Sequence, residues 1–147
     1  MYFTIHPEAG GASGFGTLFD APDPCDCYQR FETVVPQQSL AMANSQLSRN
    51  LARELGELLG RQAGKSTTAR IRIAFEELLS RPPSSDELKY CQQFLDRQMG
   101  IYKKADPKAL QQSVAATVRA PAADPAQRAF ESLIRALFNH TDFITIR

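Results

Sequence analysis

The chain has 147 residues, of which 43% are hydrophobic and 22% are charged, and its formal net charge is +1. This length suits one domain, and the ordinary composition argues against a disordered, collagen-like or coiled-coil protein. A net charge so close to zero also argues against a protein that binds nucleic acid through a strongly basic surface.

The charge is unevenly distributed along the chain. Residues 1–36 have a net charge of −4 and hold four of the eight glycines and four of the nine prolines, whereas residues 37–147 have a net charge of +5. We predict a single domain over 1–147, in which residues 1–36 form an irregular acidic segment packed on a helical body of residues 37–147. Within that body, we expect residues 103–125 to contain an inserted loop and a linker.

The first helix of the body is predicted from about residue 37 to residue 59. Leucines recur there at steps of three, four and seven residues, which places them along one face of a helix. Gly60 or Gly64 is expected to end the helix. The leucines of this face are Leu40, Leu47, Leu51, Leu55 and Leu58.

Capping signals predict the starts of four further helices. Ser66 can cap the second helix, and Ser84 with Glu87 has the spacing of a capping box for the third. Asp106 and Asp124 each precede a proline, an arrangement typical of a helix start, and so predict the fourth and fifth helices. The tail, residues 141–146, is expected to be a short extended piece or a final turn. The sequence therefore predicts an all-α fold, a compact bundle of about five helices after an irregular Gly/Pro-rich segment.

The cysteines and the termini exclude several classes of protein. No apolar run approaches the ~20 residues of a membrane-spanning helix, and the first residues lack the pattern of a signal peptide. The chain is therefore either cytosolic or a piece of a longer protein whose export signal lies elsewhere. Cys25, Cys27 and Cys91 lack a second ligand pair at metal spacing, so we predict no metal site and no cofactor, and leave the redox state of the cysteines open.

Two stretches of the body resemble catalytic or nucleotide-binding motifs only loosely. Residues 60–67 have three residues between their glycines, where a phosphate-binding loop needs four, and a predicted helix rather than a strand precedes them. Glu76 and Glu77 are adjacent on a helix and therefore point in different directions. We assign no catalytic residue and expect a protein that is not an enzyme.

Three blocks of the sequence, read in order, resemble one protein family. The first is Phe19-Asp20-Ala21-Pro22-Asp23 followed by Cys27-Tyr28-Gln29-Arg30, Thr33, Pro36-Gln37-Gln38-Ser39-Leu40 and Asn44. The second is Arg81-Pro82-Pro83-Ser84-Ser85-Asp86-Glu87-Leu88, and the last is Leu137-Phe138-Asn139-His140-Thr141-Asp142-Phe143-Ile144. Together they resemble the C-terminal domain of unknown function of the planctomycete surface family. The members of that family are large exported bacterial proteins. Phe31 departs from that pattern, in which a second arginine commonly follows Arg30.

The resemblance implies a location in the periplasm or at the cell surface, and often a c-type cytochrome domain upstream. It supplies no activity. The polar residues that match the pattern can also fasten the irregular segment to the helical body, because buried polar groups must find partners. These binding or scaffold candidates are Asp20, Asp23, Arg30, Thr33, Gln38, Asn44, Asn139 and Asp142.

Two functional hypotheses follow from these observations. The first is a non-enzymatic helical module that docks on a companion domain or partner protein in an exported bacterial assembly. The alternative is a domain that contributes Asp20, Asp23, Arg30 and Asn139 to a hydrolytic or redox active site acting on extracellular polymers. Neither hypothesis includes nucleic acid or a membrane span, and the oligomeric state is left open.

Overall fold

The computed structural model describes residues 36–105 and 120–144. Every regular element in these ranges is a helix, and no strand occurs in them, so the all-α prediction is confirmed. The chain divides into two compact units, Met1–Met42 and Ala43–Arg147. The predicted irregular segment and the predicted fourth helix, with Leu110, Val114 and Val118, lie outside the described residues.

The predicted first helix is in fact two helices. Helix α2 spans Pro36–Asn44 and α3 spans Gln46–Ala63. The break falls at Ser45, whose extended backbone (φ −63°, ψ 147°) begins α3 and whose hydroxyl accepts a hydrogen bond from the Ser48 N–H at 3.0 Å. A serine in this role satisfies one of the free N–H groups of the first turn, and this stabilises the start of a new helix.

Three of the five leucines of α3 lie on its exposed face. Leu47, Leu51 and Leu58 keep 44%, 41% and 54% of their surface exposed. The buried face of α3 consists mainly of small residues: Ser48, Ala52, Gly56 and Gly60, with Leu59 among them. Gly60 therefore lies inside the helix, and Gly64, with a φ of 66°, is the residue at its C-terminal end.

The next two helices begin where the capping signals predict. Helix α4 spans Thr67–Leu79 after Ser66, and α5 spans Ser85–Lys104 after Ser84. Both bonds of the predicted capping box are present, because the Ser84 hydroxyl accepts from the Glu87 N–H and the Glu87 carboxylate accepts from the Ser84 N–H. The apolar face of α4 is buried at Ile71, Ala74, Phe75 and Leu79.

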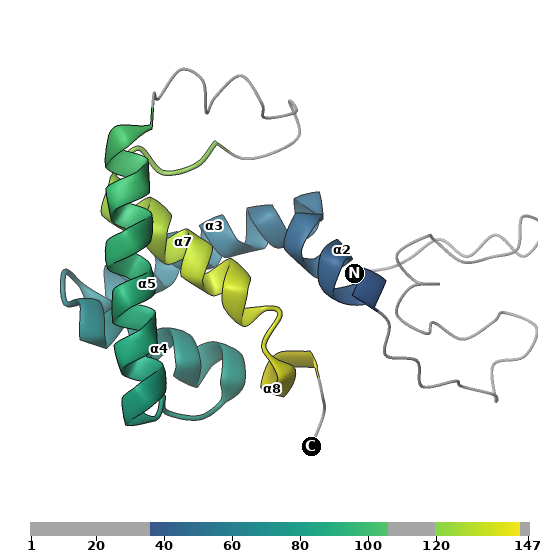
Figure 1. The fold of residues 1–147 in the computed structure, drawn as a ribbon. Coiled ribbons are helices and arrows are strands. Elements are labelled where there is room, and N and C mark those ends of the chain that lie inside the picture. Colours follow the sequence, from purple (N-terminus) through teal and green to yellow (C-terminus); the bar gives the residue numbers. More distant parts are fainter. Residues whose placement is uncertain (1–35, 106–119, 145–147) are drawn as a thin grey trace, which may run out of the picture. The chain divides into compact units, whose positions relative to one another are not determined.

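Helix α7, Pro125–Leu137, lies at the centre of the second unit. It packs against both α3 and α5, and α4 contacts these three helices and α8, Thr141–Ile144 (Figure 1). Asp124 caps α7 as predicted, and the apolar face of the helix is buried at Phe130, Leu133, Ile134, Leu137 and Phe138. Of the predicted tail, residues 141–144 form the short helix α8.

Candidate functional site

Half of the predicted site residues can be placed in the structure. Gln38 is buried in α2, and Asn44 is the exposed last residue of that helix. The Asn139 side chain donates to the Arg135 carbonyl oxygen at 3.4 Å, and Asp142 lies in α8. The other four, Asp20, Asp23, Arg30 and Thr33, lie outside the described residues.

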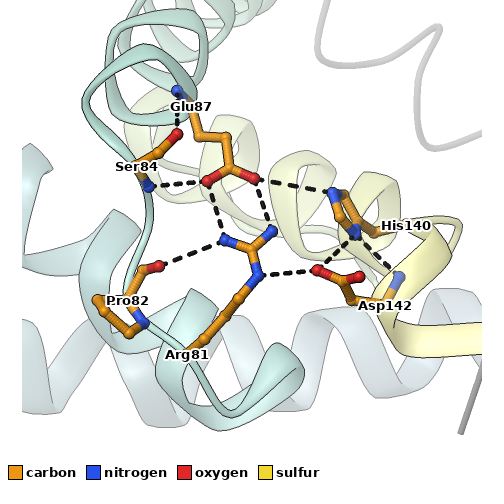
Figure 2. A network of polar contacts seen from close by, with 6 residues as sticks. All are labelled: Arg81, Pro82, Ser84, Glu87, His140 and Asp142. Carbon is orange, nitrogen blue, oxygen red and sulfur yellow. Dashed lines mark hydrogen bonds and ion pairs between the residues drawn. The ribbon is translucent and has the colours of Figure 1, made fainter. Parts of the chain in front are cut away.

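Asp142 belongs to a polar network centred on Arg81, in the turn between α4 and α5. Arg81 Nη1 and Nη2 donate to the two Glu87 carboxylate oxygens at 2.9 and 2.7 Å, and its Nε donates to Asp142 Oδ2 at 2.8 Å (Figure 2). Nη1 also donates to the Pro82 carbonyl oxygen at 3.3 Å. We call the side chains of Arg81, Ser84, Glu87, His140 and Asp142 the Arg81 network.

The local sequence holds Arg81 in this position. Ser80 ends α4 in the left-handed region (φ 54°, ψ 28°), and the two prolines after Arg81 prevent the helix from continuing. The guanidinium carbon lies 5.6 Å from the centroid of the Phe75 ring, within reach of a cation–π contact. The turn therefore presents Arg81 to the first turn of α5 on one side and to α8 on the other.

The charges of the network stabilise one another. The pKa of Glu87 is about 2, below its usual 4.5, mainly because Arg81 donates hydrogen bonds to the carboxylate; burial opposes this effect, and the bonds with Ser84 contribute to it. The bonds to Glu87 and Asp142 likewise raise the pKa of Arg81. A bidentate contact between arginine and a carboxylate is among the stronger charge-assisted hydrogen bonds in proteins.

His140 completes the network beside the two carboxylates. Its Nδ1 accepts a hydrogen bond from the Asp142 N–H at 3.1 Å, so that nitrogen carries no proton and the ring proton of the neutral imidazole lies on Nε2. Nε2 is 3.9 Å from Glu87 Oε1 (Figure 2). This distance exceeds that of a hydrogen bond, so His140 adds a weak polar contact.

The arrangement is suited to fastening helices together. Arg81 uses its Nε and both terminal nitrogens on Glu87, Asp142 and Pro82, and both carboxylates are occupied by the same guanidinium. A general acid or base would need a carboxylate that can exchange a proton near the working pH. Among the described residues, no group of three His, Cys, Asp or Glu side chains is placed to hold a metal ion.

Arg81, Glu87 and His140 were missed as site residues by sequence reasoning. All three lie in the blocks that carry the family resemblance, the first two in residues 81–88 and the third in residues 137–144. Their position inside these two blocks is the feature of the sequence that could have identified them. The structure joins these two blocks directly through the bond between Arg81 and Asp142, which are 61 residues apart in the sequence.

The described residues thus define an all-α domain with a polar network that joins the α4–α5 turn to α8. Residues 5–95 match the model of the PSD1 family, described as "protein of unknown function (DUF1553)", and the chain belongs to that family. The match includes Arg81 and Glu87 and ends before α7 and α8. No curated protein and no solved structure matches the chain.

Proposed function

We propose that the protein is a non-enzymatic helical module that docks on a companion domain or partner protein within an exported bacterial assembly. The observation that supports this proposal most directly is the exposed leucine face of α3. Family membership is consistent with it but assigns no activity. The planctomycete resemblance adds the proposed location, the periplasm or the cell surface.

The exposed leucines of α3 lie along one side of the helix. Leu47, Leu51 and Leu58 fall within about 40° of one another around the helix and span about 16 Å along it. We call these three residues the leucine stripe. Single exposed leucines are common on protein surfaces, but several large apolar side chains on one side of a helix favour an interaction site.

The stripe suits a partner that presents an apolar helix. Side chains that repeat at this spacing fit the ridges and grooves of a second helix. Its polar edge carries both signs of charge, because Glu57 and Arg61 form an ion pair there. This gives no preference for a strongly charged partner, and apolar contact therefore supplies the affinity. We accordingly propose a companion polypeptide with an apolar helix face as the occupant of the stripe.

Site-specific photo-crosslinking in the bacterium that makes the protein tests this proposal. A photoreactive residue replaces Leu51 or Leu58, with Tyr90 as the control site because it is 69% exposed on α5. We expect both leucine positions to form an adduct with one discrete second polypeptide in the periplasmic or surface fraction, and Tyr90 to form none. No adduct at the leucine positions, or an adduct between two copies of this chain, would contradict the proposal.

A double variant, Leu51→Gln with Leu58→Gln, provides an independent measurement. Both leucines are exposed, so the change in stability should stay within about 0.5 kcal/mol. The adduct formed from a photoreactive residue at position 47 should disappear. If the double variant unfolds, the two leucines belong to the core of the module and the docking surface is wrongly assigned.

A further inference from the structure

His140 lies between α7 and α8, and its side chain is bonded to the backbone of α8. The ring nitrogen Nδ1 accepts a hydrogen bond from the Asp142 N–H at 3.1 Å (Figure 2). Because Asp142 is the second residue of α8, His140 occupies the N-cap position of that helix. The ring thus satisfies one of the free N–H groups of the first turn, a role that serine or asparagine usually fills.

Helix α8 depends on contacts with the rest of the fold, because four residues are too few to form a stable helix alone. Besides the cap, Arg81 Nε donates to Asp142 Oδ2 at 2.8 Å. The Phe143 ring lies 5.2 Å from the ring of Phe138, which is buried. The position of α8 therefore decides whether Phe143 covers this part of the core.

Two carboxylates face the His140 ring. Its Nε2 lies 3.9 Å from Glu87 Oε1 of α5, and its Nδ1 lies 3.8 Å from Asp142 Oδ2 of α8. Among the described residues, α4 and α7 place no carboxylate within 4.0 Å of the ring. Arg81, from the α4–α5 turn, already bonds both carboxylates, and the ring is 34% exposed, so the attraction of a charged imidazole to them is weak.

A proton on Nδ1 is incompatible with the cap. The imidazolium ion carries an N–H on both ring nitrogens and has no acceptor left for the Asp142 N–H. Histidine is the side chain that ordinarily changes its charge between about pH 5 and pH 8. The exposed part of the ring lets solvent protons reach it. Uptake of one proton consequently breaks the bond to the Asp142 N–H and turns two N–H donors towards each other.

We propose that His140 is a pH-controlled latch for α8. The neutral ring holds the first turn of α8 and thereby keeps Phe143 over Phe138. Protonation of Nδ1 releases the Asp142 N–H and loosens that turn, while the bond from Arg81 keeps α8 attached to the α4–α5 turn. The latch responds to mild acidification, above the pH range in which carboxylates ordinarily titrate.

Nuclear magnetic resonance of the isotope-labelled full chain between about pH 8 and pH 5 tests the latch. At the alkaline end, the ring nitrogens should report the neutral form with its proton on Nε2. On acidification, the Asp142 amide signal should shift with the same midpoint as the His140 ring signals. Its protection against hydrogen exchange should fall about fivefold, the loss that corresponds to one neutral hydrogen bond.

Two substitutions at position 140 separate the cap from the charge. In His140→Asn, the side-chain oxygen can cap the helix and does not titrate, so the Asp142 amide should keep its protection throughout the pH range. His140→Ala has no side-chain acceptor, so at the alkaline end its Asp142 amide should already resemble that of the acidified wild-type protein. The Ser48 amide is the internal control, because its N–H is capped by the hydroxyl of Ser45, which does not titrate.

The proposal is overturned if the Asp142 amide of the wild-type protein keeps the same protection at both ends of the range. It is also overturned if His140→Asn loses as much protection as the wild-type protein, because a group other than His140 then responds to the pH. A fully protected Asp142 amide in His140→Ala at the alkaline end would equally contradict it, since the remaining contacts would then hold the turn without the cap.

Discussion

Arg81 bonds to side chains from two separate parts of the fold, and its removal should therefore cost more than that of an ordinary surface arginine. Arg81→Ala leaves the partly buried Glu87 and Asp142 carboxylates without their shared cation, and we expect the free energy of unfolding to fall by about 2 kcal/mol. Arg81→Lys should recover only part of this loss, because an ammonium group cannot bond two carboxylates in the same fork geometry. Urea unfolding followed by circular dichroism measures both changes.

Arg61→Ala is the control for this prediction. Arg61 pairs with Glu57 within α3, and its side chain is 76% exposed. An exposed pair of this kind contributes about 0–1 kcal/mol. Equal losses for Arg61→Ala and Arg81→Ala would mean that the Arg81 network does not fasten the helices.

The same network should make the stability of the protein depend on acid pH. The pKa of Glu87 is about 2 in the folded protein, against its usual 4.5. A carboxylate with a lowered pKa contributes stability that is fully present above pH 4.5 and is lost as the pH falls towards 2. The contribution is about 2 kcal/mol after allowance for the solvent-exposed part of the carboxylate.

A pH series of unfolding curves on two proteins measures what Arg81 contributes through its two carboxylate partners, Glu87 and Asp142. Between pH 5 and pH 2, roughly the titration range of carboxylates, the wild-type protein should lose more stability than Arg81→Met, whose Glu87 no longer has a cationic partner. Subtracting the two curves removes the contribution of carboxylates that both proteins share. Parallel curves would show that neither Glu87 nor Asp142 depends on Arg81 for its charge.

Sequence reasoning located part of this network at the residue scale. The family resemblance pointed to Asp142, and the spacing of a capping box predicted the pairing of Ser84 with Glu87. The partner of Arg81 could not be predicted, because a bond between residues 61 apart depends on how α8 meets the α4–α5 turn. Local spacing carries no information about such a contact.

At the scale of elements, the crossing of α3 and α7 depends on a glycine. A Cβ atom at Gly56 would lie 2.9 Å from Glu131 Cγ and 3.6 Å from Glu131 Cα, whereas a Cβ at Gly100 in α5 would meet nothing within 4 Å. Gly56→Ala should therefore destabilise the protein by about 1–3 kcal/mol, the usual cost of overpacking. Gly100→Ala should stabilise it by about 0.5–1 kcal/mol, because alanine is the better helix former.

Thermal unfolding of the two variants tests whether the melting temperature falls in Gly56→Ala and rises in Gly100→Ala. The same substitution in two helices controls for helix propensity, so only the packing around each glycine differs. A melting temperature that rises in both variants would show that α3 can move away from α7 without loss.

The periodicity of α3 predicted its helical structure but not which face is buried. A row of leucines is the ordinary sign of a core face, yet here Gly56 and Gly60 face α7, whereas Leu47, Leu51 and Leu58 are exposed. Small residues give a weak signal in a hydropathy pattern, although they allow the closest approach of two helices. The break at Ser45 was missed for a similar reason, since the leucine spacing continues through it.

At the scale of the whole molecule, the described core lies in one part of the chain. Every buried apolar side chain among the described residues falls between Ala52 and Phe138, within the unit Ala43–Arg147. A segment that contains a hydrophobic core and capped helices of its own can fold as a small domain. The prediction of a single domain over 1–147 leads to a different expectation, in which the body depends on residues 1–36.

A fragment of residues 43–147 distinguishes these two expectations. If the core suffices, the fragment should be helical by far-ultraviolet circular dichroism and should unfold in one cooperative transition, because the contacts of α7 with α3, α4 and α5 are all retained. Leu133→Ala in the fragment is the matched control, since loss of a buried leucine costs about 2–5 kcal/mol and should abolish or sharply lower the transition. A fragment that is helical but melts without a cooperative transition would show that the core needs residues 1–42 to reach a unique packing.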